Sequence, residues 1–267
     1  MKVPMSRDGG KPRVGIFGLT GCAGDQLQIL NCEDHLLQLV ESVNVVDWEM
    51  AKSENDRTCR LDIAFVEGVV ATERDLEALR TIRARANLLV AIGTCAVWGG
   101  LPAMRNDIPR EVLEREVYDV DRSFLDSIEA LPPTHFVRFD LLLPGCPIER
   151  HEFLAAVNSL LRGTVPELPA VPVCWECKAR ENACRVLNFH EICCGAMTRA
   201  GCGGRCPSHG VACAGCRGPI EEPNYDANIT MFADRGISWV EISDRMQNFS
   251  APAWMRMGWR AVSTPGW

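Results

Sequence analysis

The sequence lacks the features of a nucleic-acid-binding or membrane-spanning protein. Its 267 residues carry 28 Lys and Arg against 35 Asp and Glu, and no basic run offers a footprint for nucleic acid or an anionic membrane surface. No apolar stretch approaches the length of a membrane span. The opening MKVPMSRDGGKPR has neither the apolar core of a signal peptide nor a twin-arginine motif. We therefore expect a cytoplasmic protein without nucleic-acid or membrane partners.

Internal repeats and low-complexity segments are also missing from the sequence. The hydrophobic share of 47% and the charged share of 24% are those of an ordinary folded protein, which excludes extensive disorder. The length suits one large domain or two unequal ones.

Cysteine is the residue that the chain has in excess. Nine of its fourteen cysteines fall within the 43 residues from Cys174 to Cys216, separated by short spacings and many glycines. Thiols stay reduced in the cytoplasm, so this density favours metal ligation over disulfides. A glycine-rich backbone with so many thiols is typical of chains that wrap around inorganic clusters.

The first part of the chain, up to about Leu161, alternates apolar strand-like runs with amphipathic helices. Short runs rich in Val, Ile and Leu predict a parallel sheet with helices on both faces, an α/β fold. The predicted strands are Arg13 to Phe17, Asn44 to Trp48, Asp62 to Val66, Asn87 to Ile92 and His135 to Leu142.

Three apolar faces predict helices between these strands. Thr72 and Glu149 stand where two of the helices should begin. The faces are formed by Leu27, Leu30, Leu37 and Val40, by Leu76, Leu79 and Ile82, and by Phe153, Leu154, Val157, Leu160 and Leu161.

A proline-rich linker, TVPELPAVP, follows Gly163 and predicts a domain boundary. We expect an α/β domain over residues 1–165 and an irregular cysteine-rich domain over residues 166–267. Beyond Cys216 the sequence predicts one short helix from Tyr225 to Asp234, begun by Asn224 and ended by Gly236. The tail carries tryptophans that suit either an interface or a small core, namely Trp239, Trp254, Trp259 and Trp267.

Three further cysteines follow predicted strands. Cys22 comes after the first strand, Cys95 after the fourth and Cys146 after the fifth, each in a glycine- or proline-rich context. Ligands gather at the carboxyl ends of parallel strands, so these thiols should meet at one edge of the sheet. The alternative is three inert buried cysteines.

Asp25 is the candidate for a fourth ligand at this edge. It lies three residues after Cys22, where a second cysteine would complete a Cys-x2-Cys pair. Iron accepts carboxylate oxygen, and three thiolates would leave one iron of a cluster open. Asp25 also lies where the first helix should begin, so its other interpretation is a helix N-cap.

Several separated motifs follow one another along the chain, namely TGCAGDQLQILNCEDHLL, FVEGVV, AIGTCAVWGG, PGCPIERHEFL, VCWECKARENAC and TRAGCGGRCPSHGVACAGCRGP. In this order they resemble the small subunit of cytoplasmic nickel-iron hydrogenases. The resemblance covers most of the chain and is greatest to the delta subunits of the sulfhydrogenase and NAD(P)-linked types, with deazaflavin-reducing hydrogenases as relatives.

The resemblance implies a flavodoxin-like domain followed by an iron-sulfur domain, with three 4Fe-4S clusters and no nickel in this chain. By position, the proximal cluster would be held by Cys22, Asp25, Cys95 and Cys146. The distal cluster would be held by Cys174, Cys177, Cys184 and Cys193, and the medial cluster by Cys202, Cys206, Cys213 and Cys216. Most members of the family have cysteine at the position of Asp25, and some cytoplasmic ones have aspartate there.

The resemblance also bears on the remaining candidates. Glu67 is similar to a glutamate that the family places near the proximal cluster, where it would relay protons; the alternative is a carboxylate bonded to backbone amides. Cys32, Cys59 and Cys194 are left over, and Cys194 could exchange roles with Cys193. His190 and His209 are not needed as ligands, because Cys174 occupies the position where membrane-bound relatives use histidine.

The implied function is electron transfer for a hydrogenase whose nickel-iron site lies in a large subunit. Partners would be that large subunit and a flavin or iron-sulfur reductase that uses NAD(P) or a similar soluble acceptor. One alternative is the cluster-bearing subunit of quinone reductases, which has a tandem Cys-Cys after the first strand and lacks the cysteine-rich domain. The other is a non-redox binding module held together by zinc, but the last four cysteines do not have zinc-ribbon spacing.

Overall fold

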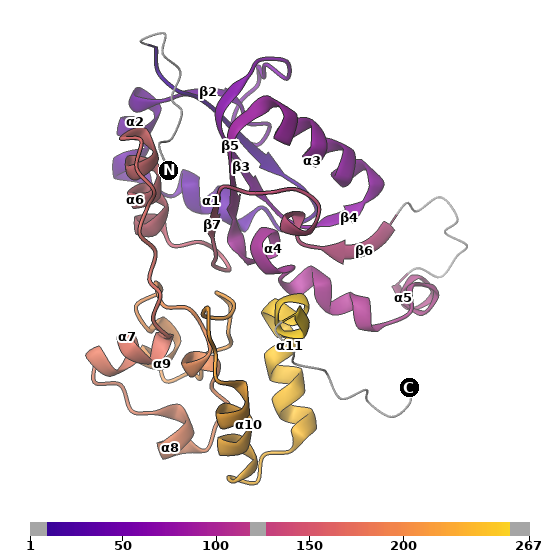
Figure 1. Cartoon of the computed structure of the whole chain (residues 1–267), viewed down its shortest axis with the longest axis vertical. Helices are drawn as coiled ribbons and strands as arrows, with labels where there is room; N and C mark the ends of the chain where they lie inside the picture. The colour runs from indigo at the N-terminus through magenta and orange to yellow at the C-terminus, as the bar shows by residue number, and fades with distance from the viewer. Residues whose placement is uncertain (1–9, 118–126, 257–267) are drawn as a thin grey trace. The chain divides into compact units, whose positions relative to one another are not determined.

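The computed structural model describes residues 10–117 and 127–256, without the side chains of Asp34, Leu36 and residues 250–256. The chain divides into two units, Met1–Glu167 and Leu168–Trp267 (Figure 1).

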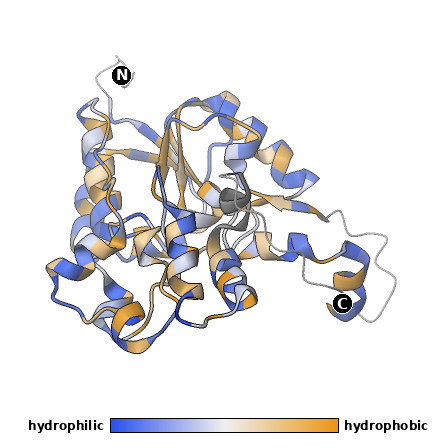
Figure 2. Cartoon of the chain, turned by 60° about the horizontal axis from the view of Figure 1, so that its bottom comes forward, coloured by the Kyte–Doolittle hydropathy of each residue, from blue (hydrophilic) through white to orange (hydrophobic). Residues whose placement is uncertain are grey.

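A five-stranded parallel sheet forms the first unit, with the strand order β2-β1-β3-β5-β7. This is the flavodoxin-like order, and it confirms the predicted α/β fold. Every residue of the central strand β3 is buried, as expected for a strand covered on both faces. Hydrophobic residues colour much of the sheet at the centre of this unit (Figure 2). The strands are β1 (Arg13–Gly18), β2 (Asn44–Asp47), β3 (Leu61–Glu67), β5 (Ala86–Ile92) and β7 (Leu141–Leu143).

Helices cover both faces of this sheet, α2 and α6 on one side and α3 on the other (Figure 1). Leu76, Leu79 and Ile82 of α3 are buried against β3 and β5, which confirms that predicted face. In α6, Phe153, Val157 and Leu160 are buried as predicted. The helices are α1 (Gly24–Leu30), α2 (Glu33–Ser42), α3 (Glu73–Arg85), α4 (Gly93–Trp98), α5 (Arg110–Val117) and α6 (Arg150–Leu161).

The first predicted apolar face is wrong. The chain breaks between α1 and α2, so residues on the two sides of the break no longer share one stripe. Leu27, Leu37 and Val40 are 46%, 75% and 47% exposed, whereas Ile29 is fully buried.

The predicted strand His135 to Leu142 is also wrong over most of its length. A 3-10 turn, η2 (Pro133–His135), opens this segment, and only β7 joins the sheet. The amides of Phe136 and Val137 donate to the Pro133 carbonyl, which keeps the backbone turned. Phe136 and Val137 nevertheless pack on the core, so an apolar loop gave the sequence signal of a strand.

A small antiparallel pair, not predicted from the sequence, adds β4 (Val70–Thr72) and β6 (Ser127–Leu131). The 3-10 helix η1 (Leu101–Asp107) packs beside it. Asn106 holds β6 from η1, because its amide group exchanges two hydrogen bonds of 2.9 Å with the backbone of Ala130.

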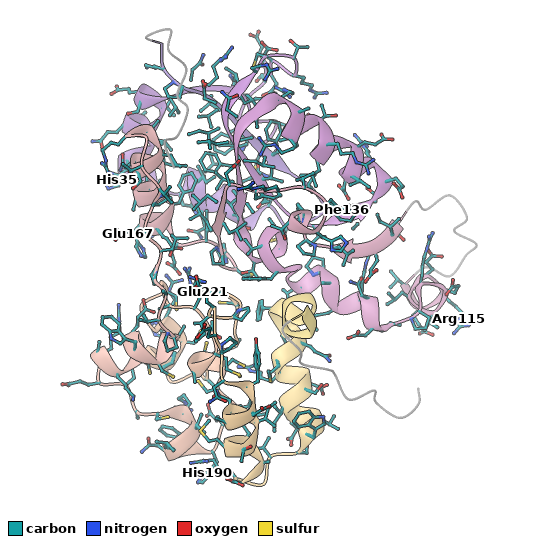
Figure 3. The ribbon with its side chains drawn as sticks, in the orientation of Figure 1. His35, Arg115, Phe136, Glu167, His190 and Glu221 are labelled. Atoms are coloured by element: carbon teal, nitrogen blue, oxygen red, sulfur yellow. The ribbon has the colours of Figure 1, made fainter. Side chains whose placement is uncertain are left out.

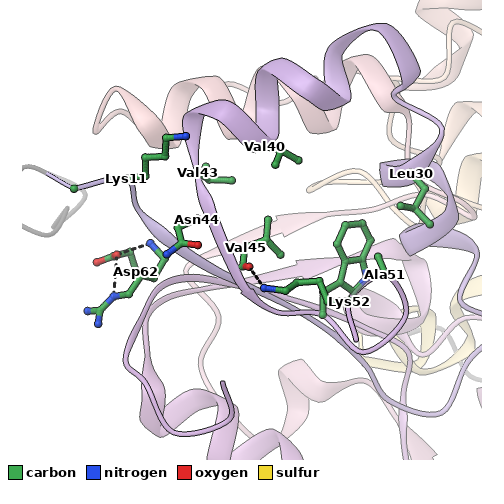
Figure 4. Close-up of a pocket in the computed structure, with 12 residues that line it drawn as sticks. Lys11, Leu30, Val40, Val43, Asn44, Val45, Ala51, Lys52 and Asp62 are labelled. Carbon is green, nitrogen blue, oxygen red and sulfur yellow. Dashed lines mark hydrogen bonds and ion pairs between the residues drawn. The ribbon is translucent and has the colours of Figure 1, made fainter. Parts of the chain in front are cut away.

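A pocket of about 880 Å³ lies between α2 and the edge strand β2 (Figure 4). Asn44 and Asp62 place it at the amino ends of the strands, away from the edge where the cysteines follow. Two of its polar residues have partners within the chain: Lys52 Nζ donates to the Val45 carbonyl, and Asp62 accepts from the Arg13 amide at 2.7 Å. The pocket is therefore separate from the candidate metal site.

The second unit is irregular, as predicted, and its helices are mostly short. Its small core contains Val186, Cys194, Met197 and Phe232, together with Ile242 and Met246. The helices are α7 (Val173–Ala179), α8 (Arg185–Phe189), η3 (Cys194–Ala196), α9 (Arg205–Ser208), α10 (Tyr225–Ala233) and α11 (Trp239–Arg256).

The predicted helix after Cys216 is confirmed as α10, since the Asn224 side chain accepts from the Ala227 amide at 3.0 Å. The 18-residue helix α11 was not predicted. It begins at Trp239, while the side chain of Trp254 and the whole of Trp259 and Trp267 lie outside the described residues. Among the described helices, none is both long and apolar enough to span a membrane.

The start of α3 gives a first prediction. Thr72 Oγ1 accepts from the Asp75 amide at 3.1 Å, and Asp75 Oδ2 accepts from the Thr72 amide at 3.0 Å, a reciprocal capping box. Thr72→Ala should lower the free energy of unfolding of this unit by about 1 kcal/mol, measured by urea denaturation. Thr81→Ala, an exposed change within the same helix, should not lower it, because alanine is the better helix former. Equal effects of the two changes would contradict the capping role.

Candidate metal centres

The carboxyl edge of the sheet brings together the residues that the sequence placed after its strands. Cys22 follows β1, Cys95 lies in α4 just after β5, and Cys146 follows β7. Burial, followed by the charges of Cys146, Asp25 and Cys22, raises the pKa of the Cys95 thiol to about 12. These groups are therefore close enough to act on one another electrostatically.

Glycines let the backbone pass close to two of these sulfurs. A Cβ atom built on Gly24 would lie 3.2 Å from Cys22 Sγ, and one on Gly100 would lie 2.7 Å from Cys95 Sγ. Gly100 also has a φ of 55°, a conformation that other residues rarely adopt. The backbone thus approaches these thiols so closely that no side chain fits between them, which suits a chain that wraps around a cluster of iron and sulfide.

Asp25 belongs to the same edge, and it is not the N-cap of the first helix. The N-cap is Ala23, and Asp25 lies inside the first turn of α1. Its Oδ1 accepts from the Ile148 amide at 2.8 Å, so the carboxyl group reaches the loop that follows Cys146. A Cβ on Gly93 would lie 1.8 Å from its Oδ2, which places the carboxyl group against the start of α4 as well.

The environment of Asp25 is unusual for a carboxylate. Burial raises its pKa to about 7, the Ile148 amide lowers the pKa, and the charge of Glu67 raises it further. A cation would stabilise its ionised form, so the donor set fits a metal centre, and the ligand role of Asp25 stays a prediction.

Glu67, the last residue of β3, holds the start of α1. Its Oε2 accepts from the amides of Asp25 at 3.1 Å and Gln26 at 3.4 Å. Its Oε1 accepts from Gln26 Nε2 at 2.6 Å, and the indole N–H of Trp48 donates to Gln26 Oε1 at 2.7 Å. Burial raises the pKa of Glu67, while the hydrogen bonds from Gln26 and Asp25 lower it.

These bonds give Glu67 a structural role. Ala23 offers no side-chain cap to α1, so the Glu67 carboxylate accepts from the first amides of the helix instead. It thereby fixes the backbone that carries Asp25. The proton-relay role of Glu67 stays a prediction.

In the second unit, one cysteine group forms around α7. Cys174 and Cys177 lie on this helix, Cys184 precedes α8, and Cys193 precedes η3. Burial, followed by the charges of Cys193, Cys177 and Cys184, raises the pKa of Cys174 to about 11. A Cβ on Gly195 would lie 3.5 Å from Cys174 Sγ and 3.6 Å from Cys193 Sγ, so glycine again borders the sulfurs.

The structure distinguishes the adjacent Cys193 and Cys194. The thiol of Cys193 faces the α7 group, and its sulfur accepts from the Cys213 amide at 3.2 Å. Cys194 is only 1% exposed and packs in the core with Met197 and Phe232. The spacing of the cysteines alone could not predict these two orientations, because neighbouring residues of an irregular turn can face either way.

Of the last four cysteines, Cys202 precedes the four-residue helix α9 and Cys206 is part of it. Cys213 and Cys216 follow in the irregular segment after this helix. Burial raises the pKa of Cys213 well above its ordinary value, and the charges of Cys194, Cys193 and Cys216 add to the shift. Cys213 therefore lies between Cys216 and the cysteines at η3.

The remaining thiols and histidines stand apart from these groups. Cys32 is buried at the junction of α1 and α2, and Cys59 is partly buried. All fourteen cysteines are among the described residues, and none forms a disulfide. His190 (Figure 3) and His209 are both exposed. Within the described part of the chain, no three His, Cys, Asp or Glu side chains converge tightly enough to hold a single metal ion.

Comparisons with known proteins agree with this arrangement. A family model described as NADH ubiquinone oxidoreductase, 20 Kd subunit, matches residues 22–160. The chain is 36% identical to the delta subunit of sulfhydrogenase 2 from Pyrococcus furiosus, over 79% of this chain and 88% of that protein. It is 31% identical to a subunit of the vhu F420-non-reducing hydrogenase of Methanocaldococcus jannaschii, over 88% and 92% of the two chains.

A solved hydrogenase structure is also similar to this chain. A chain from an NAD+-reducing NiFe hydrogenase in the H2-reduced state aligns with a TM-score of 0.55 and 32% identity, over 60% of this chain and 96% of that one. The fold and the groups of cysteines thus define the class of protein, a redox subunit of the iron-sulfur type. The chain belongs to the small-subunit family of nickel-iron hydrogenases, whose catalytic centre lies in another chain.

The contact between Gly93 and Asp25 gives a second prediction. Gly93→Ala places a methyl group on the carboxylate and also strains a backbone with a φ of 81°. We expect the free energy of unfolding to fall by about 2–5 kcal/mol. About 1–2 kcal/mol of this comes from the left-handed backbone and about 1–3 kcal/mol from overpacking. Gly236→Ala, where φ is 77° and no atom lies within 4 Å, should show the backbone cost alone. Chemical denaturation measures both, and equal losses would refute the steric role of Asp25.

The orientation of the Cys193–Cys194 pair gives a third prediction. Cys193→Ser should lower the iron content of the complex, because it removes a thiol of the α7 group. Cys194→Ala should keep the iron and cost about 1 kcal/mol of stability, because it leaves a small cavity in an apolar core. Metal analysis of the two purified variants decides between them, and the reverse pattern would make Cys194 the ligand.

Proposed function

We propose that this chain is the electron-transfer small subunit of a nickel-iron hydrogenase and holds three 4Fe-4S clusters. The observation that carries the proposal is the gathering of thiols at the sheet edge and around α7, with glycines bordering their sulfurs. The names of its relatives, sulfhydrogenase and F420-non-reducing hydrogenase, support the same function.

The proposed ligand sets follow the three cysteine groups. Cys22, Asp25, Cys95 and Cys146 hold the proximal cluster. Cys174, Cys177, Cys184 and Cys193 hold the distal cluster, and Cys202, Cys206, Cys213 and Cys216 hold the medial one. When bound, such clusters supply reversible one-electron transfer.

Other residues of the chain orient and partly bury these ligand side chains. Cys95 and Cys174 are partly buried, and solvent exposure is one determinant of the reduction potential of a cluster. Glu67 fixes the turn that carries Asp25 and is also proposed as a proton relay, since its carboxylate lies at the same edge. Nickel belongs to the partner subunit.

The partners proposed are the hydrogenase large subunit and a flavin or iron-sulfur reductase. One relative, 31% identical, is named as the delta subunit of the NAD-reducing hydrogenase HoxS and comes from Cupriavidus necator, which supports NAD(P) or a similar acceptor. A cytoplasmic location is part of the proposal. The reaction is H2 oxidation or evolution, catalysed in the large subunit.

The quinone reductase alternative rests on the family model, whose description names a ubiquinone oxidoreductase and which matches residues 22–160. The cysteine-rich second unit lies beyond that match, and the first strand is followed by the single Cys22. Relatives that align over most of this chain carry hydrogenase names. These observations favour the hydrogenase.

Metal analysis of the complex tests the function. The chain, purified anaerobically with its partner subunits, should bring roughly twelve irons and as many sulfides, four of each per cluster. One nickel should accompany the large subunit. Two zincs with little iron or sulfide would instead support a zinc-held binding module.

Asp25 has its own test. Asp25→Ala should remove up to about four irons, because the proximal cluster would lose one of its four ligands. Asp25→Cys should retain the iron and change the electron paramagnetic resonance of one cluster, since thiolate replaces carboxylate. Asp107→Ala, an exposed change in the same unit, serves as the control. Full iron content and an unchanged spectrum in Asp25→Ala would exclude Asp25 as a ligand.

A further inference from the structure

One side chain, that of Glu176, joins the two cysteine groups of the second unit. Glu176 lies on α7 between Cys174 and Cys177, which belong to the proposed distal set. Its carboxylate nevertheless makes its hydrogen bonds to the segment around Cys202, the first ligand of the proposed medial set. A residue of one group thus determines the position of a ligand in the other.

The contacts of Glu176 lie on both sides of Cys202. Oε1 accepts from the Gly201 amide at 2.9 Å, and Oε2 accepts from the Gly204 amide at 3.2 Å. Oε2 also lies 4.0 Å from Cys202 Sγ. The carboxylate therefore holds the backbone just before and just after the cysteine, and it places negative charge beside the sulfur.

The peptide bond between Ala200 and Gly201 is held at both of its polar atoms. Its N–H donates to Glu176, and its carbonyl accepts from Arg217 Nε at 2.9 Å. Arg217 is 1% exposed and directly follows Cys216, the last ligand of the medial set. The backbone beside Cys202 and the residue after Cys216 are thus connected through the peptide group between Ala200 and Gly201.

The loop needs such a support because of its own composition. Gly201, Gly203 and Gly204 have φ values of 126°, 67° and 61°. Glycine has great conformational freedom in the unfolded chain, so such a loop does not order itself. A Cβ on Gly204 would lie 3.1 Å from Cys177 Cα, which shows that the loop rests directly on the α7 backbone.

The charge of Glu176 has an electrostatic consequence. Reduction adds an electron to a cluster, and a carboxylate beside one of its ligands opposes that added charge. Net charge and hydrogen bonding near a cluster are established determinants of its potential. The carboxylate should therefore lower the potential of the cluster bound through Cys202.

We propose that Glu176 is a positioning residue that couples the two C-terminal sites. It fixes Cys202 from the helix that carries Cys174 and Cys177, and its charge lowers the reduction potential of the cluster that Cys202 helps to hold. This inference rests on the proposed iron-sulfur function of the two groups.

The test compares Glu176→Gln with the wild type in the whole complex. Iron and sulfide are counted, and a redox titration is followed by electron paramagnetic resonance. Glutamine removes the charge but keeps one carbonyl acceptor for the loop. We expect one cluster to titrate at a more positive potential, with a roughly tenfold change in its one-electron equilibrium, about 59 mV. Glu176→Ala, which removes both acceptors, should lose about four irons.

Glu181→Gln is the matched control, because it removes the same charge from an exposed residue just after α7. Its iron content and potentials should equal those of the wild type. A Glu176→Gln complex with full iron content and unshifted potentials would overturn the inference, as would an equal shift in Glu181→Gln. Loss of iron in Glu176→Gln alone would support the positioning role. A wild-type complex without iron and sulfide would refute the proposed function itself, before any variant is compared.

Discussion

The common direction of the strands is the constraint on which the first unit depends. Because all five strands are parallel, their carboxyl ends lie along one edge, and residues at or after the ends of β1, β3, β5 and β7 meet there. Cys22, Glu67, Cys95 and Cys146 are far apart in sequence and adjacent in space for this reason alone. The buried β3 keeps this edge fixed, since it is hydrogen-bonded on both sides and covered on both faces.

The second unit is built on a different principle. Its apolar core is small, and short helices separated by glycine turns surround the cysteines. Units of this kind draw stability from metal ligation in addition to burial, because bound metal adds its binding free energy to folding. Glu176 and Arg217 add a polar framework, in which side chains hold the backbone that presents Cys202.

Sequence patterns predicted the elements whose local signal agrees with their tertiary setting. Thr72, Leu76 and Leu79 predicted α3 because cap and apolar stripe coincide, and the apolar run of β3 predicted a buried strand. The patterns failed where packing overrode them. Leu37 is apolar yet 75% exposed, because the chain breaks before α2, and Phe136 is part of a loop that packs on the core without joining the sheet. The helix α11 was not predicted from the sequence pattern.

The sequence by itself determined the spacing of the cysteines and the order of the strands that carry three of them, and the proposed ligand sets follow from that spacing and order. It also placed Asp25 beside Cys22, but both a helix cap and a buried carboxylate agree with that position. Only the tertiary structure decided between them, through the Ile148 amide that donates to Asp25 from a loop 123 residues away. The same holds for the orientations of Cys193 and Cys194 and for the hydrogen bonds that Glu176 accepts on both sides of Cys202. Each depends on which side chain faces which distant backbone, and local pattern does not contain that information.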